Sequence, residues 1–325
     1  MAINIKNINS ILIFRSDGGL GDEIIYSILY RELKKANPAI NISVATFGAS
    51  GAFLKENKYI NRLYVMPMRR LHKHSRWPTL IYYGLKIRKD KFDLAIDTSY
   101  KKNYPNWKLF SKIASRDKVR EIKWISSGNH AKDSVIGILE TLGVKDFDNN
   151  YDVHLTEKSQ DKNREFLTAN GIKEYIALNP FAHAQGRTFN AETLQLIAST
   201  LNQLFDKPQI VIPYMSRKQM GKIKNLHDNF ANVYFFKTEN PFDLISLIYS
   251  AKLLISPDTS AVHIASAFKK PTIAFYNKPW DTFWSPNNPN AIVVKAGPEP
   301  DSVNIFNIEE FKLACESTVL SKQNF

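Results

Sequence analysis

Apolar residues in this chain come in short runs, and amphipathic stretches separate the runs. The clearest example spans residues 252–276, KLLISPDTSAVHIASAFKKPTIAFY. The run at 253–255 predicts a strand buried on both faces, and the turn-forming residues 256–260 end it. A helical pattern with an apolar face follows, and the run at 272–275 predicts the next strand. The stretch therefore predicts a βαβ unit.

The same alternation of strand and helix patterns runs along most of the chain. In the first half it predicts strands at residues 11–14, 41–46, 63–65 and 92–97, and helices at 22–37 and 132–142. In the second half it predicts further strands at 175–179, 209–213, 233–236 and 291–295, and helices at 191–205, 217–230, 241–250 and 308–319. Helices between successive strands are typical of parallel sheets, so the fold class is α/β, with two doubly wound, Rossmann-like domains joined near residues 150–172. Ligands bind beyond the carboxyl ends of such strands, which predicts a cleft across which the two domains face each other.

The helix of the βαβ unit begins with backbone N–H groups that can bind a phosphate. His263 lies at the start of this helix, beside the expected anion. A second ligand-binding turn is predicted after the first strand, where Gly19 and Gly21 would let a ligand approach the backbone closely. The sequence GGLGD of this turn is not a dinucleotide fingerprint. Asp22 has two interpretations that the sequence leaves open: a helix cap, or a general base held by a rigid turn.

Composition limits the class of protein. A chain of 325 residues with 44% hydrophobic residues can bury a large core and more often forms two domains than one. No apolar run reaches the roughly 18 residues that a membrane-spanning helix needs, and the first residues lack the apolar centre of a secretory signal. The single cysteine, Cys315, excludes an internal disulfide and fits a reducing compartment. We therefore expect a cytoplasmic protein.

Positive charge is concentrated in one part of the chain. The formal net charge is +13, and residues 69–124 carry 16 Lys and Arg against 5 Asp and Glu, with aromatic residues between them. Such a segment attracts an anionic partner, whether a phosphorylated substrate, an acidic bilayer surface or a nucleic acid. A solvated basic surface with no specific partner is the other interpretation.

The sequence lacks the motifs of several other chemistries. Its seven histidines show no Cys/His pairing, no H-E-x-x-H and no clustered carboxylates at ligand spacing, so no metal site is predicted. A hydrolase is not supported either, because G-x-S-x-G is absent. The residues favour group transfer assisted by cationic side chains and a helix N-terminus.

Three stretches of the chain carry a resemblance to a known family. They are RSDGGLGDEIIYSILYRELKKANP near the N-terminus, YIALNPFAHAQGRTFNAETLQLIASTL at the start of the second domain, and SPDTSAVHIASAFKKPTIAFY in the βαβ unit. Their glycine-aspartate turn, their basic loop after a strand and their Asp-Thr block with a following histidine resemble glycosyltransferase family 9, the lipopolysaccharide heptosyltransferase family. The resemblance covers nearly the full length of the chain, and the third stretch is the most specific.

The resemblance implies a GT-B-like fold. It places an N-terminal acceptor-binding domain at residues 1–155 and a C-terminal donor-binding domain at 172–306, and we expect that the last helix, at about 307–325, can pack back on the first domain. It also implies an inverting, metal-independent transfer without a cofactor, because the nucleotide-sugar is a substrate. By the same resemblance, Asp22 is the base that takes the proton of the acceptor hydroxyl.

The resemblance places the nucleotide-sugar donor in the second domain. The residues expected to hold its diphosphate and sugar are Asp258, Thr259, Ser260 and His263. Arg187 falls near the phosphates, where the family usually has a lysine, and Ser260 stands where the family usually has glycine. The family's ribose-contacting glutamate is missing here or replaced by Gln219. The donor nucleotide and its sugar, heptose or a related one, therefore stay open.

The basic segment gains a purpose from the resemblance, because the family's acceptor is a phosphorylated, lipid-linked saccharide at the inner leaflet. The acceptor-binding candidates are Gly19, Gly21, Lys101, Lys102, Arg116, Lys118 and Arg120. We expect a lipopolysaccharide or lipooligosaccharide core, or a similar anionic glycan, and a peripheral contact with the inner face of the plasma membrane. Two other functions stay open: a degenerate transferase that only binds sugars or partners, and a nucleic-acid-binding protein, although no nucleic-acid-binding module is recognisable.

Overall fold

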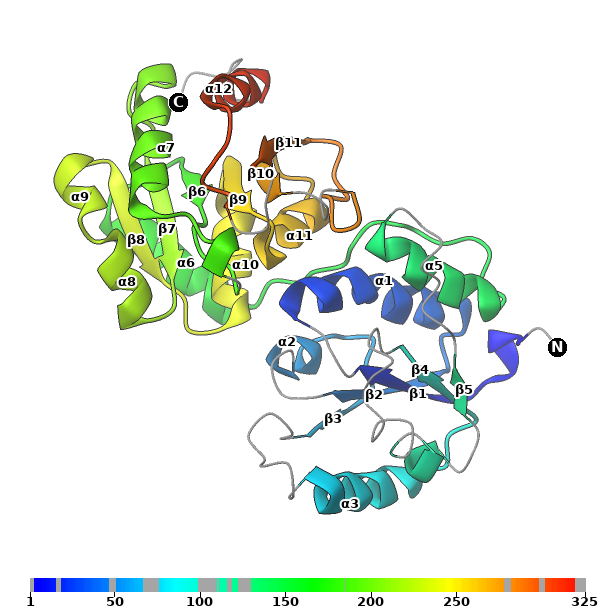
Figure 1. The fold of residues 1–325 in the computed structure, drawn as a ribbon. Helices are drawn as coiled ribbons and strands as arrows, with labels where there is room; N and C mark the ends of the chain where they lie inside the picture. Colours follow the sequence, from blue (N-terminus) through cyan, green and yellow to red (C-terminus); the bar gives the residue numbers. More distant parts are fainter. Residues whose placement is uncertain are drawn as a thin grey trace. The chain divides into compact units, whose positions relative to one another are not determined.

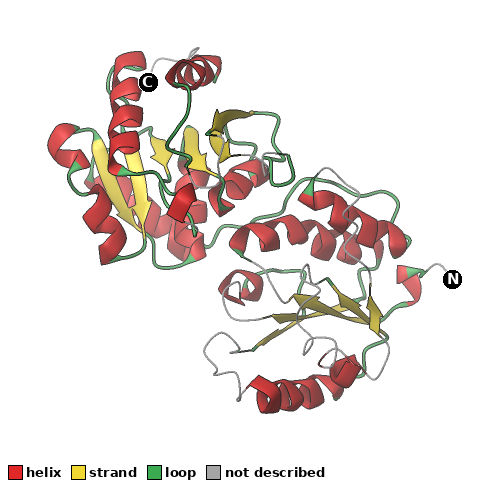
Figure 2. Ribbon diagram, in the orientation of Figure 1, coloured by secondary structure: helices red, strands yellow, loops and turns green. Residues whose placement is uncertain are grey.

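A computed structural model describes residues 3–15, 19–46, 51–66, 76–98, 110, 112–115, 119–121, 130–183, 185–277, 282–297 and 302–318. The chain divides into two compact units, unit 1 from Met1 to Asp152 and unit 2 from Val153 to Phe325. In each unit, helices cover both faces of a parallel sheet (Figure 1, Figure 2). The predicted fold class, α/β with two doubly wound domains, is confirmed.

The sheet of unit 1 has five strands in the order β3-β2-β1-β4-β5, all parallel. The strands are β1 (Ser10–Arg15), β2 (Asn41–Thr46), β3 (Arg62–Val65), β4 (Leu94–Asp97) and β5 (Val119–Glu121). The helices are η1 (Ile5–Asn7), α1 (Leu20–Ala36), α2 (Gly51–Lys55), α3 (Arg76–Arg88) and α5 (Ala131–Thr141). α1 and α5 pack together on one face of the sheet, and α3 covers the opposite face (Figure 1).

The sheet of unit 2 has six parallel strands in the order β11-β10-β9-β6-β7-β8. The strands are β6 (Ile176–Leu178), β7 (Ile210–Tyr214), β8 (Val233–Lys237), β9 (Leu253–Pro257), β10 (Thr272–Asn277) and β11 (Ala291–Ala296). The helices are α6 (Glu157–Ala169), η4 (Gln185–Arg187), α7 (Ala191–Leu204), α8 (Arg217–Ile223), α9 (Leu226–Asn229), α10 (Pro241–Ser250), α11 (Ser260–Ala267) and α12 (Ile308–Ser317). None of the helices described in either unit is both long and apolar enough to cross a bilayer.

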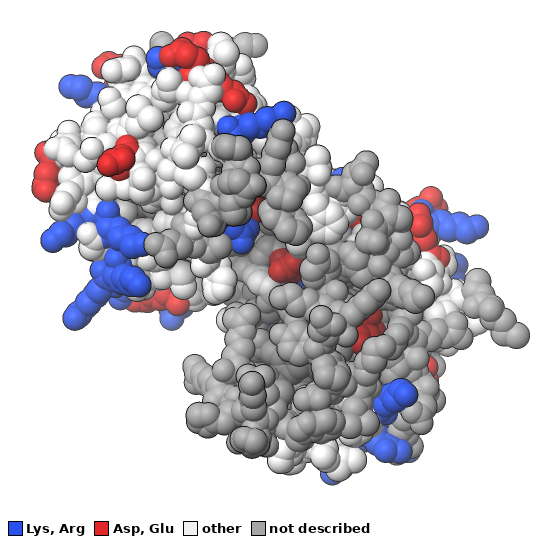
Figure 3. All heavy atoms as spheres, in the orientation of Figure 1, with Lys and Arg blue, Asp and Glu red and all other residues white. Residues whose placement is uncertain are grey.

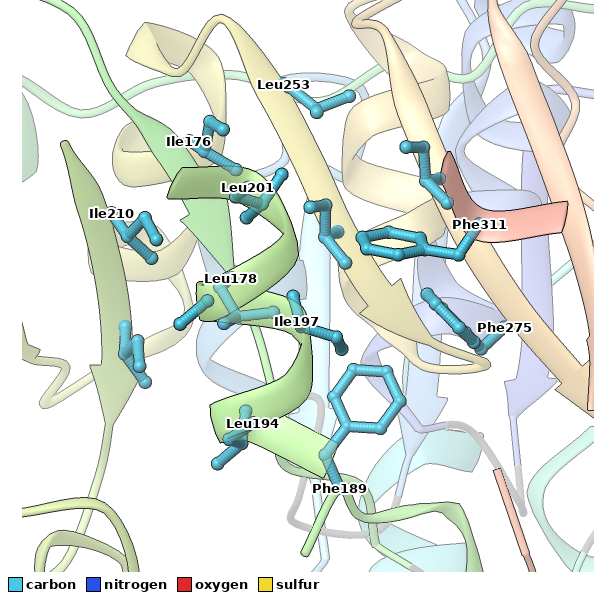
Figure 4. Close-up of a cluster of buried hydrophobic side chains, with 14 of the residues drawn as sticks. Ile176, Leu178, Phe189, Leu194, Ile197, Leu201, Ile210, Leu253, Phe275 and Phe311 are labelled. Carbon is cyan, nitrogen blue, oxygen red and sulfur yellow. The ribbon is translucent and has the colours of Figure 1, made fainter. Parts of the chain in front are cut away.

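The core of unit 2 joins its sheet to α7 and α12 (Figure 4). Leu194, Ile197 and Leu201 of α7 are buried in this core together with strand residues. Phe275 on β10 contacts the ring of Phe189 edge-on, at a centroid distance of 5.1 Å. Each large apolar side chain buried in this way contributes about 1.5–3 kcal/mol. The core therefore holds the strands whose carboxyl ends carry the candidate site.

The C-terminal helix packs within unit 2. Phe311, Ala314 and Cys315 of α12 are buried in the unit 2 core, and the ring centroids of Phe311 and Phe275 are 5.6 Å apart. The expectation that this helix also packs back on the first domain stays a prediction. The apolar face of α12 packs against α7 and β11 and completes that side of the unit 2 core.

α6 also belongs to unit 2, although it falls in the predicted linker at residues 150–172. Phe166 packs edge-on against Phe236 of β8 with centroids 5.0 Å apart, and Asn163 Nδ2 donates to Ser250 Oγ at 3.1 Å. Its fully buried residues are polar, which is why a search for apolar periodicity does not detect its packed face.

The hydrophobic pattern did not predict α3. Leu80, Gly84 and Ile87 are buried against the unit, while the outer side of the helix also carries apolar residues. A Cβ added to Gly84 would lie 2.8 Å from Ile113 Cγ2, so the glycine lets α3 lie close to the neighbouring segment 112–115. Apolar residues on both sides remove the polar–apolar contrast by which a surface helix is recognised.

Candidate active site

The sheet of unit 2 has a topological switch point between β6 and β9. The chain starts in β6, runs outward to β7 and β8, and then crosses back to β9 on the other side of β6. Parallel α/β sheets bind ligands at the carboxyl ends of the strands beside such a point. Asn179 directly follows β6, and Asp258 directly follows β9. In unit 1 the corresponding switch point lies between β1 and β4.

Thr259 caps α11 at the switch point of unit 2. Its Oγ1 accepts a hydrogen bond from the N–H of Ala261 at 3.2 Å. Asn179 Nδ2 donates to Thr259 Oγ1 at 3.1 Å and to Ser256 Oγ at 3.0 Å. These bonds fix the first turn of α11, whose backbone N–H groups and positive dipole end favour an anion. The sequence analysis did not select Asn179 as a site residue. The feature that could have identified it is a polar side chain directly after a buried strand.

Arg187 and Asp258 form an ion pair beside the start of α11. Arg187 Nη1 lies 2.7 Å from Asp258 Oδ2 and also donates to the carbonyl oxygen of Asp258 at 3.4 Å. The Asp258 side chain is 6% exposed and that of Arg187 is 35% exposed. Asp258 is therefore buried, whereas part of the Arg187 side chain is accessible to a ligand. A guanidinium has five N–H donors, and its planar geometry suits a phosphate. Asp258 therefore orients Arg187 here.

Ser260 and His263 both lie on α11, at its first and fourth residues. The non-glycine residues described with positive φ do not include Ser260, so serine in place of the family's glycine causes no backbone strain. His263 is 3% exposed, and its ring centroid is 6.5 Å from that of Trp284. Trp284 is held in turn by a hydrogen bond from Tyr276 Oη to its carbonyl oxygen at 2.7 Å. His263 is therefore buried in the first turns of α11, next to Trp284. Its contact with a donor stays a prediction.

Gln219 belongs to a helix cap at the carboxyl end of β7. Ser216 Oγ accepts from the N–H of Gln219 at 3.2 Å, and Gln219 Oε1 accepts from the N–H of Met215 at 2.6 Å. The first bond satisfies one of the N–H groups that a helix start leaves without partners, and the second ties the Gln219 side chain to the residue before the N-cap Ser216. The side-chain oxygen of Gln219 therefore stabilises α8, and the ribose contact stays a prediction.

Basic side chains gather over α8 in the lower left of unit 2 (Figure 3). This helix contributes Arg217, Lys218 and Lys222, all exposed. They follow the carboxyl end of β7, the same edge of the sheet at which Asp258 and Thr259 lie. Their positive potential favours an anionic ligand at this edge.

In unit 1, Asp22 lies in the first turn of α1. The helix begins at Leu20, two residues earlier than predicted, so Gly19 is its N-cap and Gly21 lies inside it. Asp22 Oδ2 accepts a hydrogen bond from the N–H of Gly19 at 2.8 Å. This bond confirms the capping interpretation of Asp22. Because the bond also fixes the position of the carboxylate, it is compatible with the general-base interpretation, which stays a prediction.

A buried ion pair lies beneath this turn, at the switch point of unit 1. Arg15 ends β1, and its Nε is 3.2 Å from Glu23 Oε1, while its Nη1 donates to Thr98 Oγ1 at 3.2 Å. The guanidinium carbon lies 3.5 Å from the ring centroid of Tyr26, and Tyr30 Oη donates to Glu23 Oε2 at 3.3 Å. Burial, the largest single effect, lowers the pKa of Arg15, but Glu23, Tyr26, Tyr30 and Asp22 together outweigh it, so the pKa is raised overall. The pair was not predicted; its signal is a charged residue at the end of an apolar run.

Most of the predicted acceptor-binding cations cannot be located. Lys101, Lys102, Arg116 and Lys118 lie outside the described residues, and Arg120 is described only as backbone of β5. Among the residues described, no three His, Cys, Asp or Glu side chains come together as metal ligands. Apart from Gln219 at the start of α8, the candidates whose side chains are described gather at two places, the start of α1 in unit 1 and the start of α11 in unit 2.

The similarity to solved structures extends over both units. A crystal structure of a glycosyl transferase family 9 protein from Veillonella parvula shares the fold with a TM-score of 0.82 at 18% identity, with 99% of each chain covered. An Escherichia coli heptosyltransferase, WaaC, solved with ADP, gives a TM-score of 0.72 at 16% identity and covers 94% of this chain and 99% of its own. These similarities confirm the GT-B class of fold.

The sequence comparisons identify the family. A curated relative from Escherichia coli K12 is 26% identical over 319 residues, with 88% of this chain and 81% of its own covered, and its name provisionally assigns it as lipopolysaccharide heptosyltransferase 4. The model of glycosyltransferase family 9 (heptosyltransferase) matches residues 138–307, more than half of the chain. The chain therefore belongs to glycosyltransferase family 9.

Proposed function

We propose that this glycosyltransferase moves heptose or a related sugar from a nucleotide-sugar to an anionic, lipid-linked glycan such as a lipopolysaccharide core. The main support for donor binding is the geometry at the start of α11. Thr259 caps this helix, and Arg187 forms an ion pair with Asp258 beside it. Backbone N–H groups and a guanidinium together suit a diphosphate. The names of the relatives support the substrates: one is a lipopolysaccharide heptosyltransferase by provisional name, and another was solved with ADP.

The proposed reaction is a single displacement. The acceptor hydroxyl loses its proton to Asp22 as its oxygen bonds to the anomeric carbon, and the bond from that carbon to the diphosphate breaks with its electron pair on the phosphate oxygen. Arg187 and the start of α11 stabilise the negative charge of the leaving diphosphate. One displacement inverts the anomeric configuration. Cationic and backbone donors supply the charge stabilisation, so we propose that the transfer needs neither a metal ion nor a cofactor.

The acceptor side of the proposal rests on charge. The net charge of +13 and the basic segment 69–124 suit a phosphorylated glycan. A lipid-linked acceptor would be met at the inner face of the plasma membrane, and we propose that the protein works there from the cytoplasmic side. Gly19 and Gly21, which stand at the start of α1 beside Asp22, are the acceptor-binding candidates whose position is described.

The donor can be tested by thermal shift with ADP, UDP, GDP and CMP and their sugars. A ligand that binds only the folded protein raises the melting temperature with the logarithm of its concentration over its dissociation constant. We expect one nucleotide family to stabilise the protein and Arg187→Gln to weaken its binding about tenfold or more, because a hydrogen bond to a charged group contributes about 1.5–3 kcal/mol. Arg62→Gln is the matched control, since it removes an arginine paired with Asp90 at 2.9 Å in unit 1.

Two results would count against the proposal. If no nucleotide or nucleotide-sugar shifts the melting temperature, the donor site at α11 is wrong. If the nucleotide-sugar binds but the sugar is never transferred, the chain is a degenerate transferase. Metal independence is tested by measuring transfer in the presence of EDTA. Inversion is tested by determining the anomeric configuration of the product by nuclear magnetic resonance.

A further inference from the structure

The outer face of α3 exposes large apolar side chains. Ile81 is 43%, Tyr82 61% and Leu85 49% exposed, whereas Leu80 and Ile87 on the inner side are buried. α3 is the helix on the face of the unit 1 sheet opposite α1 and α5 (Figure 1). A surface helix normally turns polar residues outward, so this exposed stripe needs an explanation.

The exposed stripe has basic residues along both edges. Each residue turns an α-helix by about 100°, so Ile81, Leu85 and Tyr82 form one continuous strip. By the same rotation Arg88 falls on one side of the strip and Lys86 on the other, and both are exposed. The sequence of the helix, RWPTLIYYGLKIR, contains no acidic residue. The outer face of α3 is therefore an apolar strip between two cations.

We propose that this outer face of α3 binds the surface of an anionic lipid bilayer. In that position Ile81 and Leu85 enter the boundary between headgroups and acyl chains, Tyr82 lies at the headgroup level, and Lys86 and Arg88 bind lipid phosphates. An apolar strip alone would suit a protein partner, and cations alone would suit a nucleic acid. The combination with an exposed tyrosine has the chemistry of an interfacial helix.

Another exposed leucine shows that apolar exposure alone does not make such a face. Leu313 on α12 is 61% exposed, more than Leu85. Its neighbours on the helix include Glu309, Glu310 and Glu316, so an anionic surface would repel this helix. Leu313 is therefore a matched control for Leu85.

The full-length protein is tested by sedimentation with vesicles of phosphatidylcholine, alone or mixed with phosphatidylglycerol. We expect binding to the anionic vesicles only. Leu85→Gln should weaken it roughly tenfold, because part of a leucine's burial free energy is lost. The double variant Lys86→Gln/Arg88→Gln should weaken it about 25-fold, at about 1 kcal/mol for each cation. Leu313→Gln should bind like the wild type.

Insertion is tested with an environment-sensitive dye. The only native cysteine, Cys315, is fully buried and burial raises its pKa to about 12, so a thiol-reactive dye attaches to an introduced cysteine instead. Dye on Tyr82→Cys should shift its emission to the blue on anionic vesicles, and dye on Leu313→Cys should not. The inference is overturned if Leu85→Gln binds like the wild type with its melting temperature unchanged, if the dye at residue 82 does not shift, or if the protein retains a single-stranded RNA but not vesicles.

The vesicle-binding experiment tests the outer face of α3 independently of the proposed sugar transfer. The inference uses the proposed function only for the idea that the acceptor is lipid-linked, and the vesicles contain neither glycan nor nucleotide-sugar. Failure of vesicle binding would leave donor binding at α11 untouched. Failure of donor binding would likewise leave the α3 result standing. Transfer to a water-soluble, delipidated acceptor should be equal in wild type and Leu85→Gln, because Leu85 lies outside the proposed catalytic machinery.

Discussion

Asp22 holds the start of α1 through a bond from the N–H of Gly19 to its carboxylate. The same carboxylate is the proposed base. Its two roles require different chemistry, since a cap needs only an acceptor oxygen whereas a base must take a proton. An amide can do the first and not the second, so single-residue changes can separate the roles.

Asp22→Asn should therefore keep the stability of the protein and lose transfer. We expect kcat to fall by about 10²–10⁴-fold, the usual contribution of a general base. Asp22→Ala should lose the same activity and also about 0.5–1.5 kcal/mol of unfolding free energy, because the N–H of the N-cap residue Gly19 loses its acceptor. Urea unfolding and transfer assays on both variants measure the two effects. Transfer by Asp22→Asn at the wild-type rate would remove Asp22 from the mechanism.

The Arg15–Glu23 pair makes a second residue-scale prediction. Arg15 is 4% exposed and Glu23 is fully buried, so removing either partner leaves an uncompensated buried charge. We expect Arg15→Met to cost about 3–5 kcal/mol in urea unfolding and Arg15→Met/Glu23→Leu to recover much of it. An equal loss in the single and the double variant would show that packing on Tyr26, rather than the charge, decides the cost.

At the scale of elements, the pattern of apolar and polar positions predicted most strands and several helices. Buried parallel strands are nearly continuous apolar runs, which is why β1 and β9 stand out. The pattern missed α3 and the packing of α6, because the first is apolar on both sides and the second buries polar residues. Hydrogen bonds across the sheet edge, such as Asn179 to Thr259, join residues 80 positions apart, and periodicity does not encode them.

The cap of α8 makes a prediction of its own. Gln219→Ala should lower the unfolding free energy by about 0.5–2 kcal/mol, because the N–H of Met215 loses its acceptor, and Gln219→Glu should keep it. Neither change should alter the donor dissociation constant if the side chain acts only as a cap. Weaker donor binding in Gln219→Ala, with binding kept or strengthened in Gln219→Glu, would instead support the ribose contact, because glutamate is the residue that the family usually has there.

α12 carries a group whose ionisation depends on folding. Burial raises the pKa of Cys315 to about 12, against about 8.5 in an unfolded chain. Below pH ~8.5 the thiol keeps its proton in both states. Above that, only the unfolded thiol ionises, so the unfolding free energy should fall by up to about 1.36 kcal/mol per pH unit. Urea unfolding at several alkaline pH values should show a steeper fall for wild type than for Cys315→Ala, and equal slopes would contradict this.

At the scale of the whole molecule, the two units follow the same topology. Each starts in a central strand, runs to one edge and crosses back, and each has its own buried core. The proposed donor groups Arg187, Asp258 and Thr259 all come from unit 2. We therefore expect donor recognition to depend on residues that the core of unit 2 alone supports.

Unit 2 expressed alone, as residues 153–325, should fold and keep nucleotide binding. Its melting temperature should rise with the same nucleotide that stabilises the full chain, with a dissociation constant within about tenfold, because the helix start and Arg187 are intact. It should not transfer sugar, since Asp22 is missing. Failure of the folded fragment to bind any nucleotide would show that unit 1 contributes to the donor site.

The boundary between Asp152 and Val153 has a consequence for how this enzyme could diversify. If donor groups lie wholly after the boundary and acceptor groups wholly before it, sugar choice and acceptor choice are inherited as separate blocks of sequence. Recombination at that one point would exchange one specificity and preserve the other. Hybrids joined there between two family members should take the donor preference of the parent that supplies the second half.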